Sequence, residues 1–145
     1  MGTNEGDLAP EYVLNLPQNR QVSSTDLVSQ GKPVFIIFHA TWWPDCRSAL
    51  RSLTEVYPPF KDQVDFYAVA FNESLNELQT YQNDSGHAGT VARSAGNMIR
   101  DFRVTQQSTK IAIDANGVII YRVGLGRGGA SEWTNVFQQL ANSAQ

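Results

Sequence analysis

Two near-continuous apolar runs, Val34 to Phe38 and Val64 to Phe71, are the strongest pattern in the chain. Runs of this length, rich in β-branched and aromatic residues, are typical of strands that are covered on both faces of a sheet. Between them, apolar residues recur at helical spacing from about Pro44 to Tyr57. A strand, a helix and a strand in this order pair in parallel through a right-handed crossover, so we predict two neighbouring parallel strands at the centre of the sheet.

Weaker patterns precede this unit. Glu11 to Leu16 alternates between apolar and polar residues, Pro17-Gln18-Asn19 breaks the alternation, and Gln21-Val22 can return as the second strand of a short hairpin. Ser24 or Thr25 then predicts the N-cap of a short helix that ends at Gln30.

The second half of the chain predicts two more helices, a hairpin and a last helix. Leu75 to Gln82 has the spacing of a short helix that ends by Gly86, and Ser94 is the expected cap of a helix that buries Met98 and Phe102. Asn116-Gly117 lies between two strand-like runs, which is a strong hairpin signal because both residues accept a positive φ. Ser131 is the expected cap of a final helix whose inward residues are Trp133, Val136, Phe137 and Leu140.

Length and charge limit the class of protein. The 145 residues are 41% hydrophobic and suit a single domain, with residues 1–7 expected to lie outside its ordered part. The net charge is −3 and Lys and Arg form no cluster, which argues against a nucleic-acid surface. No apolar run approaches the roughly 18 residues that a membrane-spanning helix requires, so we expect no membrane span.

The segment from Phe38 to Cys46 carries the most specific chemistry. It reads Phe-His-Ala-Thr-Trp-Trp-Pro-Asp-Cys and resembles the active-site segment of thioredoxin-family thiol–disulfide oxidoreductases, where a buried strand runs into Ala-Thr-Trp-Cys-x-x-Cys. Thr41, Trp42, Pro44 and Cys46 fall where the family's active-site segment has them. Trp43, however, stands where the family has its first, nucleophilic cysteine.

From about Leu8 to Leu140, the chain resembles the TlpA/ResA-like, redoxin-type members of the thioredoxin superfamily. Gly6 to Leu14 is similar to their opening segment, and Asn72 to Arg93 resembles the insertion that marks them. Met98 to Val104, followed by the hairpin, resembles their approach to the closing strands. The resemblance implies an α/β thioredoxin-like fold: a central mixed sheet with helices on both faces, an N-terminal extension and an insertion after the second core strand. It also favours an extracytoplasmic or periplasmic location with a leader removed.

The loop that faces the motif departs from the family as well. Relatives carry a cis proline where this chain has Ser108. In those relatives, the residue before the proline hydrogen-bonds an extended peptide through its backbone, and Gln107 holds that position here. Because a cis bond before a non-proline residue costs about 2.5–4 kcal/mol, we predict that the Gln107–Ser108 bond is trans. The resemblance implies a substrate-binding surface formed by five residues: Trp42, Trp43, Pro44, Gln107 and Ser108.

Cys46 is the only cysteine in the sequence, and it aligns with the resolving cysteine of the family. A dithiol reductase needs one thiolate to attack and a second thiol to resolve the mixed disulfide, so we expect no dithiol turnover. Cys46 is either a reactive monothiol or a small residue that packs under the helix. Trp43 either adds to an exposed aromatic surface or fills space near the motif, whereas burial or half-burial is favoured for Trp42.

Three other chemistries are poorly supported. A peroxiredoxin pattern, Pro-x-x-x-Thr-x-x-Cys, would require proline at His39 and threonine at Trp43. A metal site is not expected, because His39 and His87 lie in different elements without a second cysteine; His39 is expected to cap or pack near the motif and His87 to be a solvated loop residue. Gly124 to Gly129 lacks the ending of a phosphate-binding loop and predicts a flexible turn, and no cofactor is expected.

Two classes of function remain from the sequence. The first is a non-catalytic or repurposed binding module that presents the thioredoxin-like cleft to a protein or peptide thiol or disulfide partner. The second is a redox enzyme that acts through the single thiol of Cys46. Insulin reduction and thiol labelling discriminate between them, since fold alone does not determine function.

Overall fold

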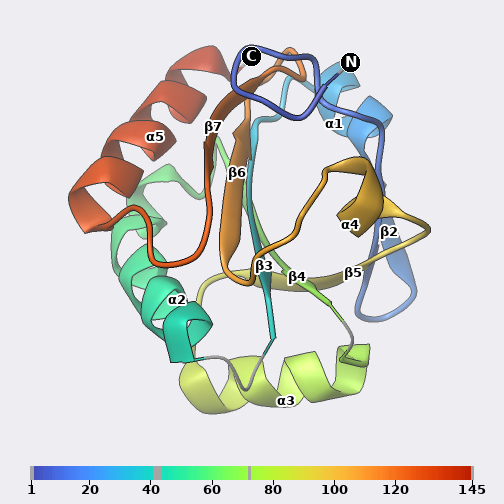
Figure 1. The fold of residues 1–145 in the computed structure, drawn as a ribbon, viewed down its shortest axis with the longest axis vertical. Coiled ribbons are helices and arrows are strands. Elements are labelled where there is room, and N and C mark those ends of the chain that lie inside the picture. The colour runs from blue at the N-terminus through green and yellow to red at the C-terminus, as the bar shows by residue number, and fades with distance from the viewer. Residues whose placement is uncertain (1, 41–43, 72, 145) are drawn as a thin grey trace.

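The computed structural model describes residues 2–40, 44–71 and 73–144, with Pro44 and Asp45 described by their backbone alone. Within these residues, seven strands form one mixed sheet in the order β2-β1-β5-β4-β3-β6-β7 (Figure 1). The strands are β1 (Val13–Leu16), β2 (Arg20–Ser23), β3 (Val34–His39), β4 (Asp65–Ala70), β5 (Thr90–Ser94), β6 (Thr109–Ile113) and β7 (Ile119–Val123). The helices are α1 (Ser24–Ser29), α2 (Pro44–Val56), α3 (Leu75–Ser85), α4 (Met98–Asp101) and α5 (Ala130–Ser143), with a 3-10 turn η1 (Pro58–Phe60) after α2.

The two apolar runs form the centre of the sheet, as predicted. β3 and β4 pair in parallel from Val34↔Asp65 to His39↔Ala70, and α2 provides the crossover between them. Every residue of β3 is buried, because helices cover both faces of this strand. The predicted α/β thioredoxin-like architecture is therefore confirmed.

Alternate side chains of β3 enter two separate cores. Phe35 and Ile37 pack with residues of α2 and α5, which lie together on one side of the sheet in Figure 1. Val34, Ile36 and Phe38 pack on the opposite face with residues of α1 and α4. The strand thus fixes α2, and with it the motif at the start of α2, against the middle of the sheet.

The closing hairpin also has the predicted form. β6 pairs antiparallel with both β3 and β7, and the β6–β7 turn contains Asn116-Gly117. Oδ1 of Asp114 accepts hydrogen bonds from the backbone N–H groups of Asn116 and Val118, at 2.9 and 3.0 Å. Gly117 adopts φ +85°, which explains why glycine suits this position.

Three predicted helix starts are wrong. The N-cap of α1 is Ser23, whose Oγ accepts from the N–H of Asp26, rather than Ser24 or Thr25. Ser94 is not a cap but the last residue of β5, a strand that was not predicted and that pairs with β4 and β1. The last helix begins after Gly129 without a side-chain cap, ahead of Ser131.

The N-terminal residues are hydrogen-bonded to the closing hairpin. Gly6 N–H donates to the carbonyl of Ile119 at 2.8 Å, and Ile119 N–H donates to the carbonyl of Asp7 at 2.9 Å. The guanidinium of Arg122 donates to the carbonyl of Thr3 at 3.2 Å. These bonds hold Thr3, Gly6 and Asp7 against the β7 edge of the sheet.

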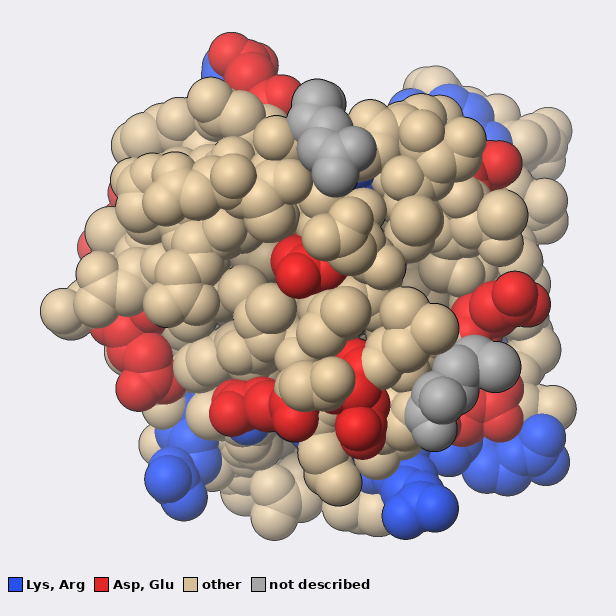
Figure 2. Space-filling view, turned by 90° about the horizontal axis from the view of Figure 1, so that it is seen from above, with Lys and Arg blue, Asp and Glu red and all other residues tan. Residues whose placement is uncertain are grey.

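Charged side chains of both signs are interspersed on the end of the molecule that carries the chain termini. Figure 2 shows this end, where Lys and Arg lie in separate groups mainly towards the rim and Asp and Glu extend towards the centre. This face therefore offers no continuous basic patch of the kind that a phosphate backbone requires. None of the described helices combines the length and apolarity that crossing a bilayer demands.

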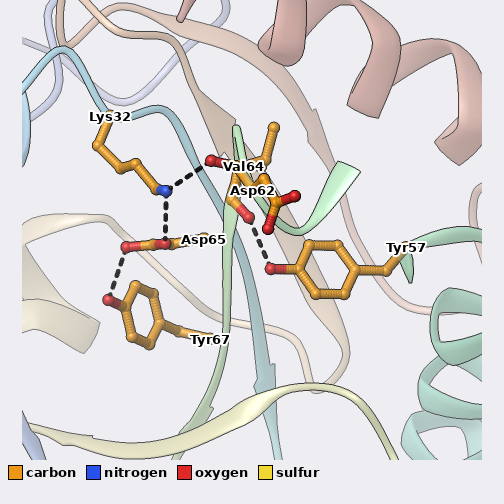
Figure 3. A network of polar contacts seen from close by, with 6 residues as sticks. All are labelled: Lys32, Tyr57, Asp62, Val64, Asp65 and Tyr67. Atoms are coloured by element: carbon orange, nitrogen blue, oxygen red, sulfur yellow. Dashed lines mark hydrogen bonds and ion pairs between the residues drawn. The ribbon is translucent and has the colours of Figure 1, made fainter. Parts of the chain in front are cut away.

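A polar network holds the beginnings of β3 and β4 together (Figure 3). The Nζ of Lys32 donates to the carbonyl of Asp62 at 3.1 Å and pairs with the Asp65 carboxylate at 3.6 Å. The hydroxyl of Tyr67 donates to Oδ2 of Asp65 at 3.0 Å, and the hydroxyl of Tyr57 donates to the carbonyl of Val64 at 2.6 Å. The network joins the segment before β3, the end of α2 and the start of β4.

Candidate active site and its surroundings

Cys46 lies in the first turn of α2, the helix that follows β3 in the chain, as the motif predicts. Its side chain is 0% exposed and forms no disulfide. Trp42 and Trp43 fall outside the described residues, and Pro44 is described only as the first residue of α2. A small residue that packs under the helix, one of the two interpretations of Cys46, would be buried in this way.

Ser108 faces this thiol from the loop before β6. The Gln107–Ser108 peptide bond is trans, as predicted. Ser108 is fully buried, adopts φ +60°, and donates its N–H to the carbonyl of Phe38 at 2.9 Å. Gln107 is only half-buried, so of these two residues it is the one that reaches the surface.

Burial raises the pKa of the Cys46 thiol, and this effect outweighs all others at the site. The backbone of Ala40, the side chain and backbone of Ser108 and the positive charge of Lys110 act in the opposite direction, because each favours the thiolate. A thiol with a raised pKa is protonated at neutral pH and is a poor nucleophile.

Lys110 is a site residue that the sequence analysis missed. It lies on β6 with 1% exposure, although lysine is rarely buried. Its Nζ donates to the carbonyls of Gly124 and Arg127, both at 3.2 Å, and lies 5.6 Å from the centre of the Trp133 ring. Every residue of β6 is buried, and the apolar residues that follow Lys110 in this strand are the signal that could have revealed it. The glycine-containing loop is therefore tied to a buried ammonium group.

The prediction that His87 is a solvated loop residue is wrong. His87 is 6% exposed, and its ring centre lies 6.2 Å from that of His39, the last residue of β3. The amide of Gln82 donates to the carbonyls of His87 and Gly89, and Gly89 N–H donates to Nδ1 of His87 at 3.1 Å. These bonds turn the loop after α3 inward, whereas the sequence shows only a polar stretch around Gly86.

Both histidines are neutral at pH 7. The pKa of His39 is lowered to about 4, mainly by burial; His87 acts in the same direction and Glu73 opposes the shift. Burial also lowers the pKa of His87 to about 4. Because Nδ1 of neutral His87 accepts a hydrogen bond, its proton resides on Nε2. No other part of the described chain hydrogen-bonds this Nε2, or either ring nitrogen of His39.

The two imidazoles do not extend into a metal-binding cluster. Among the described residues, no three His, Cys, Asp or Glu side chains are grouped so as to hold a metal ion. His39 packs near the motif, as one of its two predicted roles required, and it contacts Tyr81 of α3 as well as His87.

Comparison with known proteins agrees with this geometry. Residues 6–122 match the model of the AhpC/TSA family. The thiol-disulfide oxidoreductase ResA of Bacillus thuringiensis (strain Al Hakam) is 27% identical over 120 residues, which cover 81% of this chain and 68% of ResA. The match does not restore the Pro-x-x-x-Thr-x-x-Cys pattern, since His39 and Trp43 still occupy its proline and threonine positions.

Solved structures share the fold. A thiol:disulfide interchange protein of the thioredoxin family from Chlorobium tepidum TLS superposes with a TM-score of 0.79 at 23% identity, covering 95% of this chain and 98% of the other. A secreted Mycobacterium tuberculosis disulfide oxidoreductase gives a TM-score of 0.72 at 19% identity, covering 88% and 95%. The chain thus belongs to the AhpC/TSA family and is a TlpA/ResA-like member of the thioredoxin superfamily.

Proposed function

We propose that this protein is a thioredoxin-fold binding module that does not turn over disulfides. The observation that carries the proposal is the state of Cys46, a lone cysteine that is completely buried. Disulfide exchange begins with the attack of an accessible thiolate, and the resulting mixed disulfide is resolved by a second thiol. Cys46 lacks the access for the first step, and the chain has no other cysteine for the second.

The loop before β6 supplies one side of the proposed binding surface. The described part of the chain offers no hydrogen-bond partner to the backbone N–H or C=O of Gln107, whereas the N–H of Ser108 is already bonded to Phe38. An extended peptide could pair with these backbone groups, as peptides do when they add to the edge of a sheet. We expect Trp42, Trp43 and Pro44 to form the opposite side, with Ser108 supporting the loop from below.

A redox enzyme that acts through Cys46 is the alternative. The groups that favour a thiolate, Lys110, Ser108 and the backbone of Ala40, support it. Such an enzyme would need a motion that exposes Cys46, and it would form a mixed disulfide that a thiol from another molecule resolves.

Insulin reduction by dithiothreitol, with and without the protein, tests the proposal. We expect no more catalysis by the wild type than by Cys46→Ala, because neither has an accessible thiol pair. In parallel, a thiol reagent should label Cys46 far more slowly in native protein than in urea. Catalysis above the Cys46→Ala control, or native labelling as fast as labelling of the unfolded chain, would overturn the binding-module proposal in favour of the monothiol enzyme.

We also propose an extracytoplasmic location. The structural similarity to a secreted disulfide oxidoreductase supports it. Fractionation of the source cells, with antibodies against this chain, should place it outside the cytoplasm; recovery in the cytoplasmic fraction alone would contradict the proposal.

A further inference from the structure

A hollow of about 430 Å³ lies between α2 and α3, beside the histidine pair. Its polar lining comes from α2, α3 and the loop that follows α3, and it includes Arg47, Arg51, Glu55, Tyr81, Ser85 and His87. Neither Gln107 nor Ser108 lines it, so it is distinct from the proposed peptide-binding surface. A volume in this range accommodates a small molecule rather than a single ion.

Two guanidinium groups share the face of α2 that borders the hollow. Arg47 and Arg51 are four residues apart, and like charges at this spacing disfavour the helix unless something neutralises them. The guanidinium of Arg47 lies 5.7 Å from the centre of the Tyr81 ring. Arg51 has no ion pair or hydrogen bond with any described residue, and Glu55 is the single carboxylate in the lining. Two guanidinium groups thus border the hollow against one described carboxylate, although the protein as a whole is acidic.

His87 provides a second, independent indication of a ligand. It lines the hollow while being more than nine-tenths buried, and its Nε2–H donor has no hydrogen-bond partner among the residues that the structure describes. A buried donor without a partner costs free energy, so such groups in native proteins are usually satisfied by protein, water or ligand. Because this nitrogen is itself buried, an acceptor in the hollow would satisfy it after a small movement of the ring or of its neighbours.

We propose that this hollow binds a small molecule through an oxyanion group, a phosphate or a carboxylate, held by Arg47, Arg51 and the Nε2–H of His87. Arginine presents its N–H groups as a planar fork that matches both kinds of oxyanion. The phenol of Tyr81 and the hydroxyl of Ser85 add neutral donors at the edge. This site goes beyond the proposed function and requires no chemistry at Cys46.

Titration of the full chain with inorganic phosphate, and separately with succinate, tests the proposal by NMR at constant ionic strength. We expect saturable shifts of the Arg47 and Arg51 side-chain signals and of the His87 ring for at least one of the two anions. Arg51→Gln should weaken binding about tenfold or more, because one charge-assisted hydrogen bond is lost. Arg100→Gln is the matched control, since Arg100 is an exposed arginine on α4, across the sheet from α2.

His87→Asn examines the buried donor separately. The Asn carboxamide oxygen can replace Nδ1 as the acceptor for Gly89 N–H, while the Nε2–H donor is lost, so binding should weaken with little change in fold. Saturation by phosphate alone or by succinate alone supports the site and identifies the anchoring group. Shifts that rise without saturating, or that Arg51→Gln and Arg100→Gln reduce equally, would indicate an adventitious ion only and overturn the proposal. None of these measurements depends on redox activity, so this site and the binding-module function can fail independently.

Discussion

The ring of His87 stands edge-on to the ring of His39, with 6.2 Å between their centres and 78° between their planes. The contact joins the end of a central strand to the loop after α3, beside the helix that carries Cys46. Both rings are neutral in the folded protein, since burial holds the pKa of each near 4. A proton on either ring would place a charge on a side chain that is largely buried, which costs free energy.

The histidine pair predicts acid sensitivity below neutral pH. The folded pKa values of about 4 lie below the ordinary value of 6.5, so the unfolded chain binds protons first as the pH falls. The free energy of unfolding should therefore decrease between about pH 6.5 and pH 4, by roughly 3 kcal/mol per histidine, and this contribution should level off below pH 4. Urea unfolding across this pH range measures the decrease.

His39→Leu and His87→Asn provide the comparison. Each substitution removes one titrating group, so each should reduce the loss of stability between pH 6.5 and pH 4, whatever it does to stability at pH 7. If both variants kept the wild-type pH dependence, the loss would have to come from other groups, such as carboxylates.

The centre of the fold could be predicted because its sequence signal is local. Val34 to Phe38 and Val64 to Phe71 are apolar at nearly every position, and such runs have few alternatives to a covered strand. β5 was missed because it is short and only Val91 and Ala92 are buried next to the polar pair Arg93 and Ser94. Its existence depends on β1 and β4, which pair with it from distant parts of the chain.

The site shows the same division between local and tertiary information. The motif located Cys46 at the start of a helix, because strand, proline and helix follow one another directly. The buried states of Lys110 and His87 could not be predicted in this way. Lys110 donates to carbonyls of a loop beyond β7. His87 is held in a turn that Gln82 stabilises, where its Nδ1 accepts from Gly89 N–H. Polar residues that the sequence suggests are solvated are here buried with partners that only the fold supplies.

Lys110→Met should raise the pKa of the Cys46 thiol further. The ammonium of Lys110 favours the thiolate, and methionine has a similar length without the charge. We expect a further increase, measured from the thiolate absorbance after subtraction of the Cys46→Ala spectrum. Lys32→Met removes a lysine at the opposite end of β3 and should leave the thiol pKa unchanged. Equal effects of the two substitutions would show that the influence of Lys110 is not local.

Gly128→Ala should destabilise the loop before α5 more than Gly126→Ala does. Both glycines have positive φ, at +87° and +69°, so alanine strains the backbone at either position by about 1–2 kcal/mol. A Cβ at Gly126 meets nothing within 4 Å, whereas a Cβ at Gly128 would lie 2.6 Å from Nε1 of Trp133 and 2.8 Å from the Tyr121 hydroxyl. Overpacking should add about 1–3 kcal/mol for Gly128→Ala, as measured by urea unfolding. Equal costs for the two variants would contradict the close contact at Gly128.

Asp65→Asn should weaken the network at the start of β4 by a modest amount. The substitution removes the ion pair with Lys32, whose atoms are 3.6 Å apart and whose side chains are about 28–29% exposed, but retains an oxygen that can accept from Tyr67. Because such a pair is partly screened, the expected loss is about 0.5–1 kcal/mol and should shrink at high salt. Asp101→Asn removes the more exposed pair with Arg100 and should cause no measurable change. A salt-independent loss at Asp65 would point to the hydrogen bond rather than to the charge.

Ser108→Pro should destabilise this protein, although proline is the residue that its relatives carry at this position. Ser108 has φ +60°, which the proline ring does not allow, and its N–H donates to the carbonyl of Phe38 at 2.9 Å, which proline cannot do. We expect the free energy of unfolding to fall by about 3 kcal/mol or more, because the backbone must change region and a buried carbonyl loses its partner. Ser108→Gly keeps the N–H and favours positive φ, so it separates the backbone effect from the loss of the hydroxyl and should cost much less. If Ser108→Pro were as stable as the wild type, the loop before β6 would have a second accessible conformation. The single substitution would then give this protein the backbone geometry with which its relatives hold a peptide.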